Sequence, residues 1–144
     1  MQNEKTIIDA IRSGRAYEKF KEMVRTQYGS LEYIDNVEKF PVAKNIIPVY
    51  STDGGFVQRI DADVVGSIAR YLGAGRMENN SEINRTAGIE LKKKMGDEVK
   101  SGDILAYIHT DDDTKVMGAT QNLKEAFQLS PKQVAVKSKV LEVI

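Results

Sequence analysis

The amino-acid sequence predicts an α+β fold, with a β-rich sandwich core that is crossed by two helices and preceded by helical segments. Three observations predict this class. Apolar residues recur at helical spacing over the first 28 or so residues and again over residues 64–72. Short runs rich in β-branched residues, bounded by glycine turns, fill much of the chain after residue 45. The length of 144 residues and the apolar fraction of 41% suit one globular core.

The first predicted element is an amphipathic helical segment, Glu4 to Tyr28, with an interruption at Ser13–Gly14. Ser13 is a candidate N-cap for the second helix, and Gly29 is a candidate for its end. The apolar side chains recur three and four residues apart: Ile7, Ile8, Ile11, Tyr17, Phe20, Met23 and Val24. This face predicts packing on the rest of the chain or on a second copy.

Residues 30–44 predict a mixed connector, which leads to two short strand pieces. The pieces are Ile46–Ile47 and Val49–Tyr50, and Pro48 stands between them. Proline removes a donor from the hydrogen-bonding ladder, so this pattern favours an edge strand with an interruption.

The next segment predicts a turn, a strand and a helix. Asp53–Gly55 forms the turn and Phe56–Ile60 the strand, after which Asp61 or Asp63 stands where a helix cap belongs. Gly73–Gly75 ends the helix. The helix has an apolar face made of Val64, Val65, Ile68, Ala69 and Leu72.

After a polar loop over residues 77–87, β-type residues return. Ile89–Leu91 alternates as a strand does, and Ile104–Ile108 is a second apolar run. Between them, residues 95–99 and 101–103 predict turns. The Asp53–Val57 and Gly96–Val99 stretches are similar acidic-glycine turns that lead to a valine, and we expect them to build two matching halves of a sandwich.

The last elements are a helix and closing strands. Asp113 is expected to cap a helix that runs to about Phe127, with Asp111 and Asp112 solvated. Val134–Ile144 alternates apolar and polar residues and is expected to form one or two strands.

Composition excludes several classes of function. Lys plus Arg equals Asp plus Glu at 21 each, so the chain lacks the basic excess of a nucleic-acid binder. The run Lys92–Lys94 is interpreted as a solvated strand end. There is no cysteine, which excludes disulfides, thiolate metal sites and a cysteine nucleophile. No apolar run approaches membrane-spanning length, and Met1–Ala10 is not a secretory signal, so we expect a cytoplasmic protein without a membrane partner.

Three groups of residues have chemical alternatives, and each is interpreted as structural. Gly73–Arg76 has the glycines of a phosphate loop but follows a helix, at the negative end of its dipole, where anions are not bound. His109 has no Ser or Cys partner nearby in sequence. Asp111–Asp113 lacks the alternating ligands of a calcium loop. No catalytic, cofactor-binding or metal-binding residue is therefore assigned.

Several motifs follow one another in a specific order: Ser13–Val24, Gly54–Val57, the LGAGR stretch Leu72–Arg76, Gly88–Ile89 and Lys93–Val99. Each motif alone is weak, but the ordered set resembles the carboxy-terminal region of pyrimidine-nucleoside and thymidine phosphorylases and covers nearly the whole chain. Two departures are Arg85-Thr86-Ala87 before Gly88, and Tyr28 where that family often has glycine.

The resemblance implies an α/β-hammerhead domain, related to the barrel-sandwich hybrid of biotinyl and lipoyl carriers, over residues 30–144. Residues 1–29 would be a helical segment from the preceding lobe. The glycine pattern from Gly96 to Ala106 independently looks like a hairpin of such a sandwich.

The resemblance also implies a function. The parent reaction is the phosphorolysis of pyrimidine nucleosides to base and pentose 1-phosphate, but the family's signature and catalytic residues have no counterpart here. We therefore expect a non-catalytic domain without a cofactor, which contributes to structure and domain closure, and the sequence leaves open whether the chain is an enzyme. Its expected partners are the N-terminal lobes of such an enzyme and, through its apolar face, a second copy. The candidate interdomain loop contains Gly73, Gly75, Arg76 and Arg85.

Two alternatives stay open at this point. One is a stand-alone interaction or structural module. The other is a biotinyl or lipoyl carrier, for which Lys94–Met95 is superficially similar to a modified lysine. That lysine precedes the turn, whereas a carrier lysine occupies the exposed hairpin between the two halves.

Overall fold

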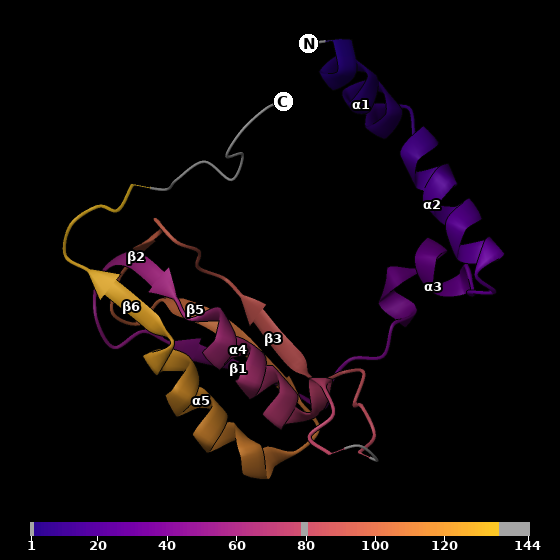
Figure 1. The fold of residues 1–144 in the computed structure, drawn as a ribbon. Helices are drawn as coiled ribbons and strands as arrows, with labels where there is room; N and C mark the ends of the chain where they lie inside the picture. The colour runs from indigo at the N-terminus through magenta and orange to yellow at the C-terminus, as the bar shows by residue number, and fades with distance from the viewer. Residues whose placement is uncertain (1, 79–80, 136–144) are drawn as a thin grey trace. The chain divides into compact units, whose positions relative to one another are not determined.

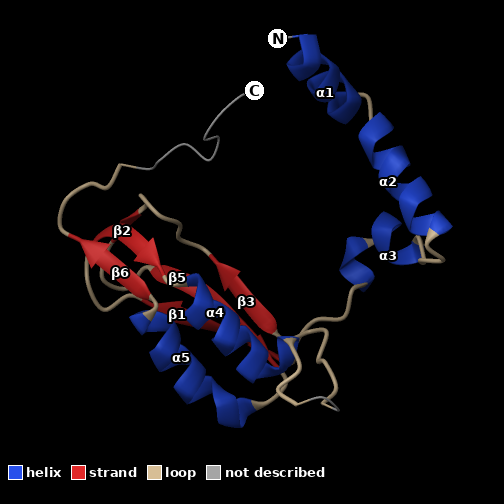
Figure 2. Cartoon of the chain, viewed as in Figure 1, coloured by secondary structure: helices blue, strands red, loops and turns tan. Residues whose placement is uncertain are grey.

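A computed structural model describes residues 2–78 and 81–135. The chain divides into two compact units, Met1–Pro41 and Val42–Ile144. The described part of the first unit is helical, whereas the second contains the sheets together with the helices α4 and α5 (Figures 1 and 2). This mixture of helices and antiparallel sheets confirms the predicted α+β class.

The first unit consists of α1 (Gln2–Arg12), α2 (Arg15–Thr26), α3 (Glu32–Asp35) and a 3₁₀ turn, η1 (Val37–Lys39). The predicted interruption lies between α1 and α2, where Gly14 has a φ of 79°. The predicted cap at Ser13 is wrong, because its hydroxyl donates to the carbonyl of Asp9 at 2.6 Å and Gly14 occupies the N-cap.

The end of α2 also differs from the prediction. The amide of Gly29 donates to the carbonyl of Val24 at 2.9 Å, and the amide of Tyr28 donates to Arg25 at 3.0 Å. This pair of bonds is a Schellman motif, whose left-handed position usually carries glycine. Here Tyr28 occupies that position with a φ of 59°, and Gly29 follows it.

The first of two three-stranded antiparallel sheets has the order β1–β5–β3, formed by Asn45–Tyr50, Ile104–Thr110 and Gly88–Leu91. The edge position predicted for β1 is confirmed. The predicted interruption is wrong, since Pro48 lies within a continuous strand and is paired with Tyr107. The strand's only irregularity is a register shift between Val49 and Tyr50.

The second sheet has the order β4–β2–β6, formed by Glu98–Val99, Gly55–Ile60 and Phe127–Ser130. It brings together the two acidic-glycine turns, because Gly55 is paired with Val99 and Phe56 with Glu98. The two turns therefore lie side by side in one sheet, and the expectation that they form matching halves of a sandwich is wrong.

The helices of the second unit are α4 (Ala62–Ala69) and α5 (Val116–Glu125). Asp61 caps α4 by accepting a hydrogen bond from the amide of Val64 at 3.2 Å, which decides between the two predicted aspartates. A π-helical turn, η2 (Arg70–Ala74), extends α4, and Gly73 then turns the chain with a φ of 117°.

The capping predicted before α5 is shifted by one residue. Asp112, rather than Asp113, accepts from the amide of Thr114 and caps the 3₁₀ turn η3 (Asp113–Lys115) that leads into α5. The helix ends at Glu125, so Phe127 belongs to strand β6, which the sequence did not predict. Most of the predicted closing strand, Val134–Ile144, lies outside the described residues.

The core lies between the two helices and the sheets. Figure 1 shows α4 and α5 side by side over the strands, and the two helices are in contact. Val64 is an exception to the predicted apolar face, since it is 37% exposed. The buried core residues are Val49, Val57, Ile68, Leu72, Val99, Leu105, Ala106, Ile108, Ala119, Leu123 and Phe127.

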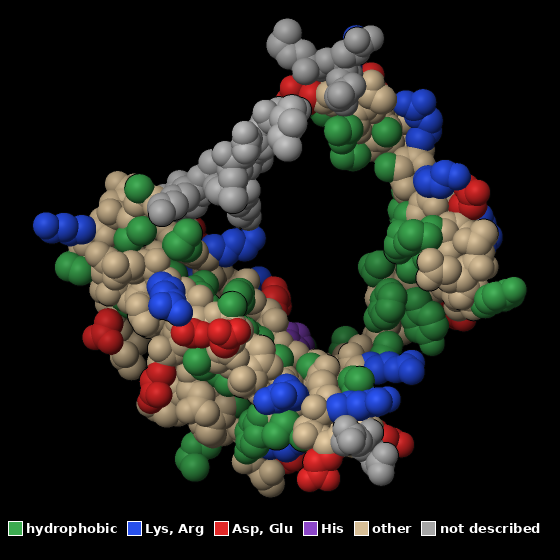
Figure 3. All heavy atoms as spheres, viewed as in Figure 1, with side chains coloured by type: hydrophobic (Ala, Val, Ile, Leu, Met, Phe, Trp, Pro, Cys, Tyr) green, Lys and Arg blue, Asp and Glu red, His purple; other side chains and the backbone are tan. Residues whose placement is uncertain are grey.

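Polar contacts join α2 to α3 in the first unit. Tyr17 donates to the carbonyl of Ile34 at 2.8 Å, and the ammonium of Lys21 lies 3.0 Å from the carboxylate of Asp35. No residue of α2 or α3 is buried. The hydrophobic side chains along these helices therefore remain at the surface, where Figure 3 shows them gathered.

Candidate functional site

The candidate site is the pair of chain segments that leave and return to the core after α4. We call residues 73–76 the outgoing arm and residues 84–87 the returning arm. The carbonyl of Gly73 accepts a hydrogen bond from the amide of Asn84 at 2.9 Å. A Cβ on Gly73 would lie only 3.2 Å from that of Asn84, so glycine serves both the positive φ and the close approach of the arms.

Asp111, just after β5, holds the returning arm. Its Oδ1 accepts from the backbone amide of Lys44 at 2.7 Å. Its Oδ2 lies 2.8 Å from Asn84 Nδ2 and 2.9 Å from the hydroxyl of Thr86. The hydrogen bond from Lys44, followed by those from Asn84 and Thr86, holds the pKa of Asp111 below its ordinary value. The carboxylate thus joins the start of β1, the end of β5 and the returning arm.

Sequence reasoning missed this cluster. It interpreted Asp111 as a solvated neighbour of a helix cap, whereas the structure makes it the acceptor for three donors. A local signal was present, since Asn84 and Thr86 have the spacing of an Asx turn, in which Asn84 Oδ1 accepts from the Thr86 amide at 2.9 Å. Nothing local in the sequence connects that turn to Asp111.

The two arms each present an arginine. Arg76 and Arg85 are both exposed, and within residues 2–78 and 81–135 neither guanidinium has an ion-pair partner. The predicted interdomain loop also contains two glycines. Gly73 lies against the returning arm, and Gly75 lies against the side chain of Arg70. The outgoing arm follows α4 and η2, so its position at the helix carboxyl end is unsuited to a phosphate.

His109 lies one residue before the end of β5. Its Nε2 is 3.8 Å from a carboxylate oxygen of Glu90, and that carboxylate also lies 3.0 Å from the ammonium of Lys92. Lys92 and, to a smaller degree, His109 lower the pKa of Glu90. This is a surface charge cluster on the first sheet.

The aspartates after β5 have separate roles. Asp111 holds the arm, Asp112 caps η3, and Asp113 accepts from the side chain of Asn45. Over residues 2–78 and 81–135, no three His, Cys, Asp or Glu side chains gather into a group that could hold a metal ion.

The run Lys92–Lys94 makes more hydrogen bonds within the fold than the sequence indicated. Lys93 is not merely solvated, because its ammonium donates to Asp103 at 2.9 Å and to the carbonyl of Glu98 at 2.8 Å. The backbone amide of Lys94 donates to Asp97 at 2.7 Å within the turn before β4. The run therefore braces the two turns that flank β4.

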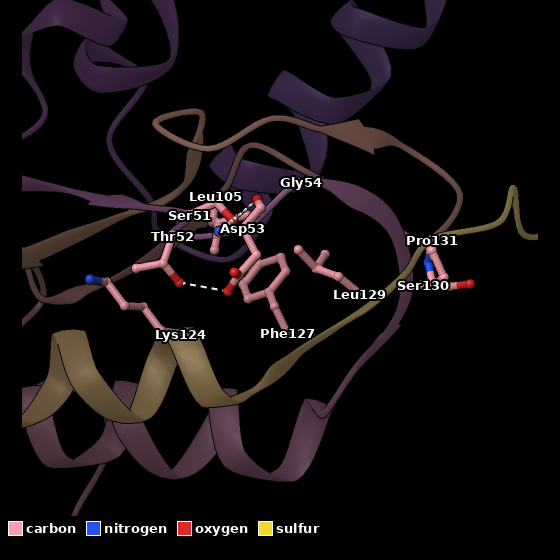
Figure 4. A pocket seen from close by; sticks show the side chains of 10 residues that line it. All are labelled: Ser51, Thr52, Asp53, Gly54, Leu105, Lys124, Phe127, Leu129, Ser130 and Pro131. Carbon is pink, nitrogen blue, oxygen red and sulfur yellow. Dashed lines mark hydrogen bonds between the residues drawn. The ribbon is translucent and has the colours of Figure 1, made fainter.

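A pocket of about 360 Å³ lies between the turn after β1, the end of α5 and strand β6 (Figure 4). Its polar side is engaged internally: the Thr52 hydroxyl donates to the Asp53 carboxylate, and the Ser51 hydroxyl donates to the Asp53 carbonyl, each at 2.8 Å. The lining residues are Ser51, Thr52, Asp53, Gly54, Leu105, Lys124, Phe127, Leu129, Ser130 and Pro131.

In the described part of the chain, no helix has both the length and the apolar character needed to cross a membrane. The fold and the candidate site together define an α+β domain whose two arms present Arg76 and Arg85 at the surface.

Comparison with known proteins identifies the family. Residues 56–130 match the family model of the pyrimidine nucleoside phosphorylase C-terminal domain, and the chain belongs to that family. It is 37% identical over 121 residues to a pyrimidine-nucleoside phosphorylase of Geobacillus stearothermophilus, which covers 84% of this chain and 28% of the relative. A pyrimidine-nucleoside phosphorylase of Staphylococcus aureus (strain USA300) is 38% identical over 104 residues, 72% of this chain and 24% of the relative. The chain thus spans about a quarter of the length of these relatives.

Proposed function

We propose that this chain acts as the carboxy-terminal α/β-hammerhead domain of a pyrimidine-nucleoside phosphorylase and supplies none of the catalytic groups. The observation that carries the proposal is the family match over residues 56–130, which includes α4, both arms and all the strands except β1 and the first residue of β2. The parent reaction is phosphorolysis of a pyrimidine nucleoside to base and pentose 1-phosphate, and its catalytic groups would come from the N-terminal lobes.

Within such an enzyme, residues 1–29 would belong to the preceding lobe and residues 30–144 to the hammerhead domain. Arg76 and Arg85 would dock on the catalytic lobe when the enzyme closes. Their exposure and their lack of ion-pair partners among the described residues support this role. A guanidinium fits a carboxylate through two parallel hydrogen bonds, so acidic side chains are the expected docking partners.

The exposed apolar face of α1 and α2 also supports self-association of the isolated chain. Ile7 is 60% exposed, Ile11 66% and Met23 48%, which is unusual for side chains of this size on adjacent helices. Sedimentation equilibrium is expected to give a mass above that of the monomer. A monomeric mass at high concentration would remove homodimer formation from the proposal.

The first experiment measures phosphate-dependent release of uracil and thymine by the purified chain at high concentration. No release is expected, because the phosphate and nucleoside sites need groups from the catalytic lobes. Robust release would overturn the assignment of the chain as non-catalytic. An added mass on Lys94 in the same preparation would instead favour a carrier domain.

The second experiment is a chimera of the Geobacillus stearothermophilus enzyme, in which the segment that matches this chain is replaced by this chain. The chimera is expected to phosphorolyse uridine, whereas the enzyme without that segment is expected to lose activity. Arg76→Ala in the chimera should lower kcat/KM by about tenfold, the effect of losing one charged hydrogen bond. Lys132→Ala removes an exposed charge elsewhere and is the control. Unchanged kinetics for Arg76→Ala would refute the docking role of this arginine.

A further inference from the structure

We propose that Asp111 is a positioning residue, whose carboxylate holds the returning arm so that the backbone at Arg85 is fixed and its side chain is presented outward. The inference rests on the proposed function, since the surface that Arg85 meets would be a carboxylate of the catalytic lobe. Its basis is the geometry of the arm, in which Arg85 lies between the two residues that Asp111 holds.

The arm is fixed on both sides of Arg85. Asn84 donates through its side chain to Asp111 Oδ2 at 2.8 Å, and Thr86 places its hydroxyl 2.9 Å from the same oxygen. The side chain of Asn84 also accepts from the Thr86 amide, and the Asn84 amide is bound to the carbonyl of Gly73. The backbone that carries Arg85 therefore has little freedom, while its side chain extends from the surface.

The charge on Asp111 is essential to this arrangement. A carboxylate accepts hydrogen bonds only, and Asp111 faces three donors: the Lys44 amide, the Asn84 amide group and the Thr86 hydroxyl. The Thr86 hydroxyl also lies 2.7 Å from Asn84 Oδ1, and its single hydrogen serves one of the two acceptors at a time. An asparagine at position 111 would turn a donor toward one of these donors and lose that bond.

Fixing the backbone of a docking residue before the encounter matters for affinity. Immobilising a loose arm on docking costs conformational entropy, and a preformed arm avoids that cost. The same carboxylate also accepts from the Lys44 amide at the start of β1. The position of the Arg85 backbone is therefore fixed relative to the sheet and not only within the loop. Arg76, on the outgoing arm, lies three residues after Gly73, whose carbonyl accepts from the Asn84 amide.

Exchanging the two side chains tests the proposal. Asp111→Asn alone brings two amides together, and Asn84→Asp alone brings two carboxylates together. The double variant Asn84→Asp/Asp111→Asn restores one carboxylate facing one amide. Amide hydrogen exchange of Asn84 and Thr86 in the full chain should accelerate by about tenfold in Asp111→Asn and return toward the original rate in the double variant. Asp113→Asn, which alters the neighbouring contact with Asn45, is the matched control and should leave these two amides unchanged.

The same variants in the chimera test the effect on Arg85. The kcat/KM of Asp111→Asn should fall as far as that of Arg85→Ala, the two losses should not add, and the double exchange should recover activity. Unchanged amide exchange in Asp111→Asn, or a double variant that recovers nothing, would overturn the positioning role. Altered exchange with unchanged kinetics in an active chimera would overturn the presentation of Arg85. If the unmodified chimera is inactive, the proposed function fails, while exchange in the isolated chain still decides whether Asp111 holds the arm.

Discussion

A single side chain at the end of α2 adopts a conformation that its chemistry disfavours. Tyr28 has a φ of 59° and is 98% exposed, so no packing compensates for the contact between its Cβ and the backbone. Two hydrogen bonds, from the amides of Tyr28 and Gly29, hold it there. The end of α2 therefore contains stored strain at one surface residue.

Replacing this residue by glycine should relieve the strain. We expect Tyr28→Gly to stabilise the end of α2 by up to about 1 kcal/mol, after allowance for the greater freedom of glycine in the unfolded chain. Slower amide exchange at Gly29 and higher far-UV circular dichroism would report it. Tyr28→Ala retains the Cβ and should give no such gain, so equal effects of the two variants would contradict the explanation.

The lowered pKa of Asp111 predicts how acid affects the arm. The folded chain binds this proton less tightly than the unfolded chain does, so the stabilisation is fully present above the ordinary value of 3.8. It is lost as the pH falls through the lower value of the folded state. The difference in free energy of unfolding between the parent chain and Asp111→Asn should therefore be constant near neutral pH and shrink in acid. A difference that persists unchanged in acid would argue against an ionised Asp111.

For single residues, the sequence predicts which type of residue caps a helix better than it predicts the exact position of that residue. An aspartate cap before α4 was predictable, but the choice between Asp61 and Asp63 depends on where the strand before it ends. The cap before α5 is Asp112 rather than Asp113 because the helical turn η3 already begins at Asp113. The role of Asp111 could not be predicted, since its partners Lys44 and Asn84 are 67 and 27 residues away.

Among the elements, helix α5 offers a direct test of how the core is packed. Leu123 is fully buried, whereas Met117, on the same helix, is 85% exposed. We expect Leu123→Ala to destabilise the second unit by about 2–5 kcal/mol through the cavity that it leaves. Met117→Ala should stay within about 0.5 kcal/mol. Urea unfolding of both variants measures the difference, and similar losses would mean that α5 is not packed as described.

The elements that sequence reasoning missed are those that depend on distant partners. Strand β6 has four residues, and only pairing with β2 makes Phe127–Ser130 extend after the helix. Likewise, the turns at Gly55 and Gly96 have similar sequences, which says nothing about whether they share a sheet. By contrast, the interruption at Gly14 and the cap at Asp61 are local, and the sequence predicted both regions.

For the whole molecule, the division into two units predicts unequal stability. Among the described residues, the buried hydrophobic side chains lie between Ala43 and Phe127, so residues 42–144 should unfold cooperatively without residues 1–41. Residues 1–41 alone should be weakly helical, because α1 and α2 have only 11 and 12 residues and no buried side chain in α2. Circular dichroism of the two separate pieces checks this. If the separate piece 42–144 were much less stable than the same residues in the full chain, the first unit would have to contribute to the stability of the core.

The order in which the strands are paired has a consequence for biosynthesis. β1 must wait for β5, since Asn45 is paired with Thr110, and β2 must wait for β6, since Phe56 is paired with Ser130. At ordinary rates of translation the first strands therefore leave the ribosome several seconds before their partners exist. During that interval the apolar residues of β1 and β2 are available to chaperones and to other nascent chains. Pro48, in β1, lacks an amide hydrogen and makes that strand a poorer template for aggregation.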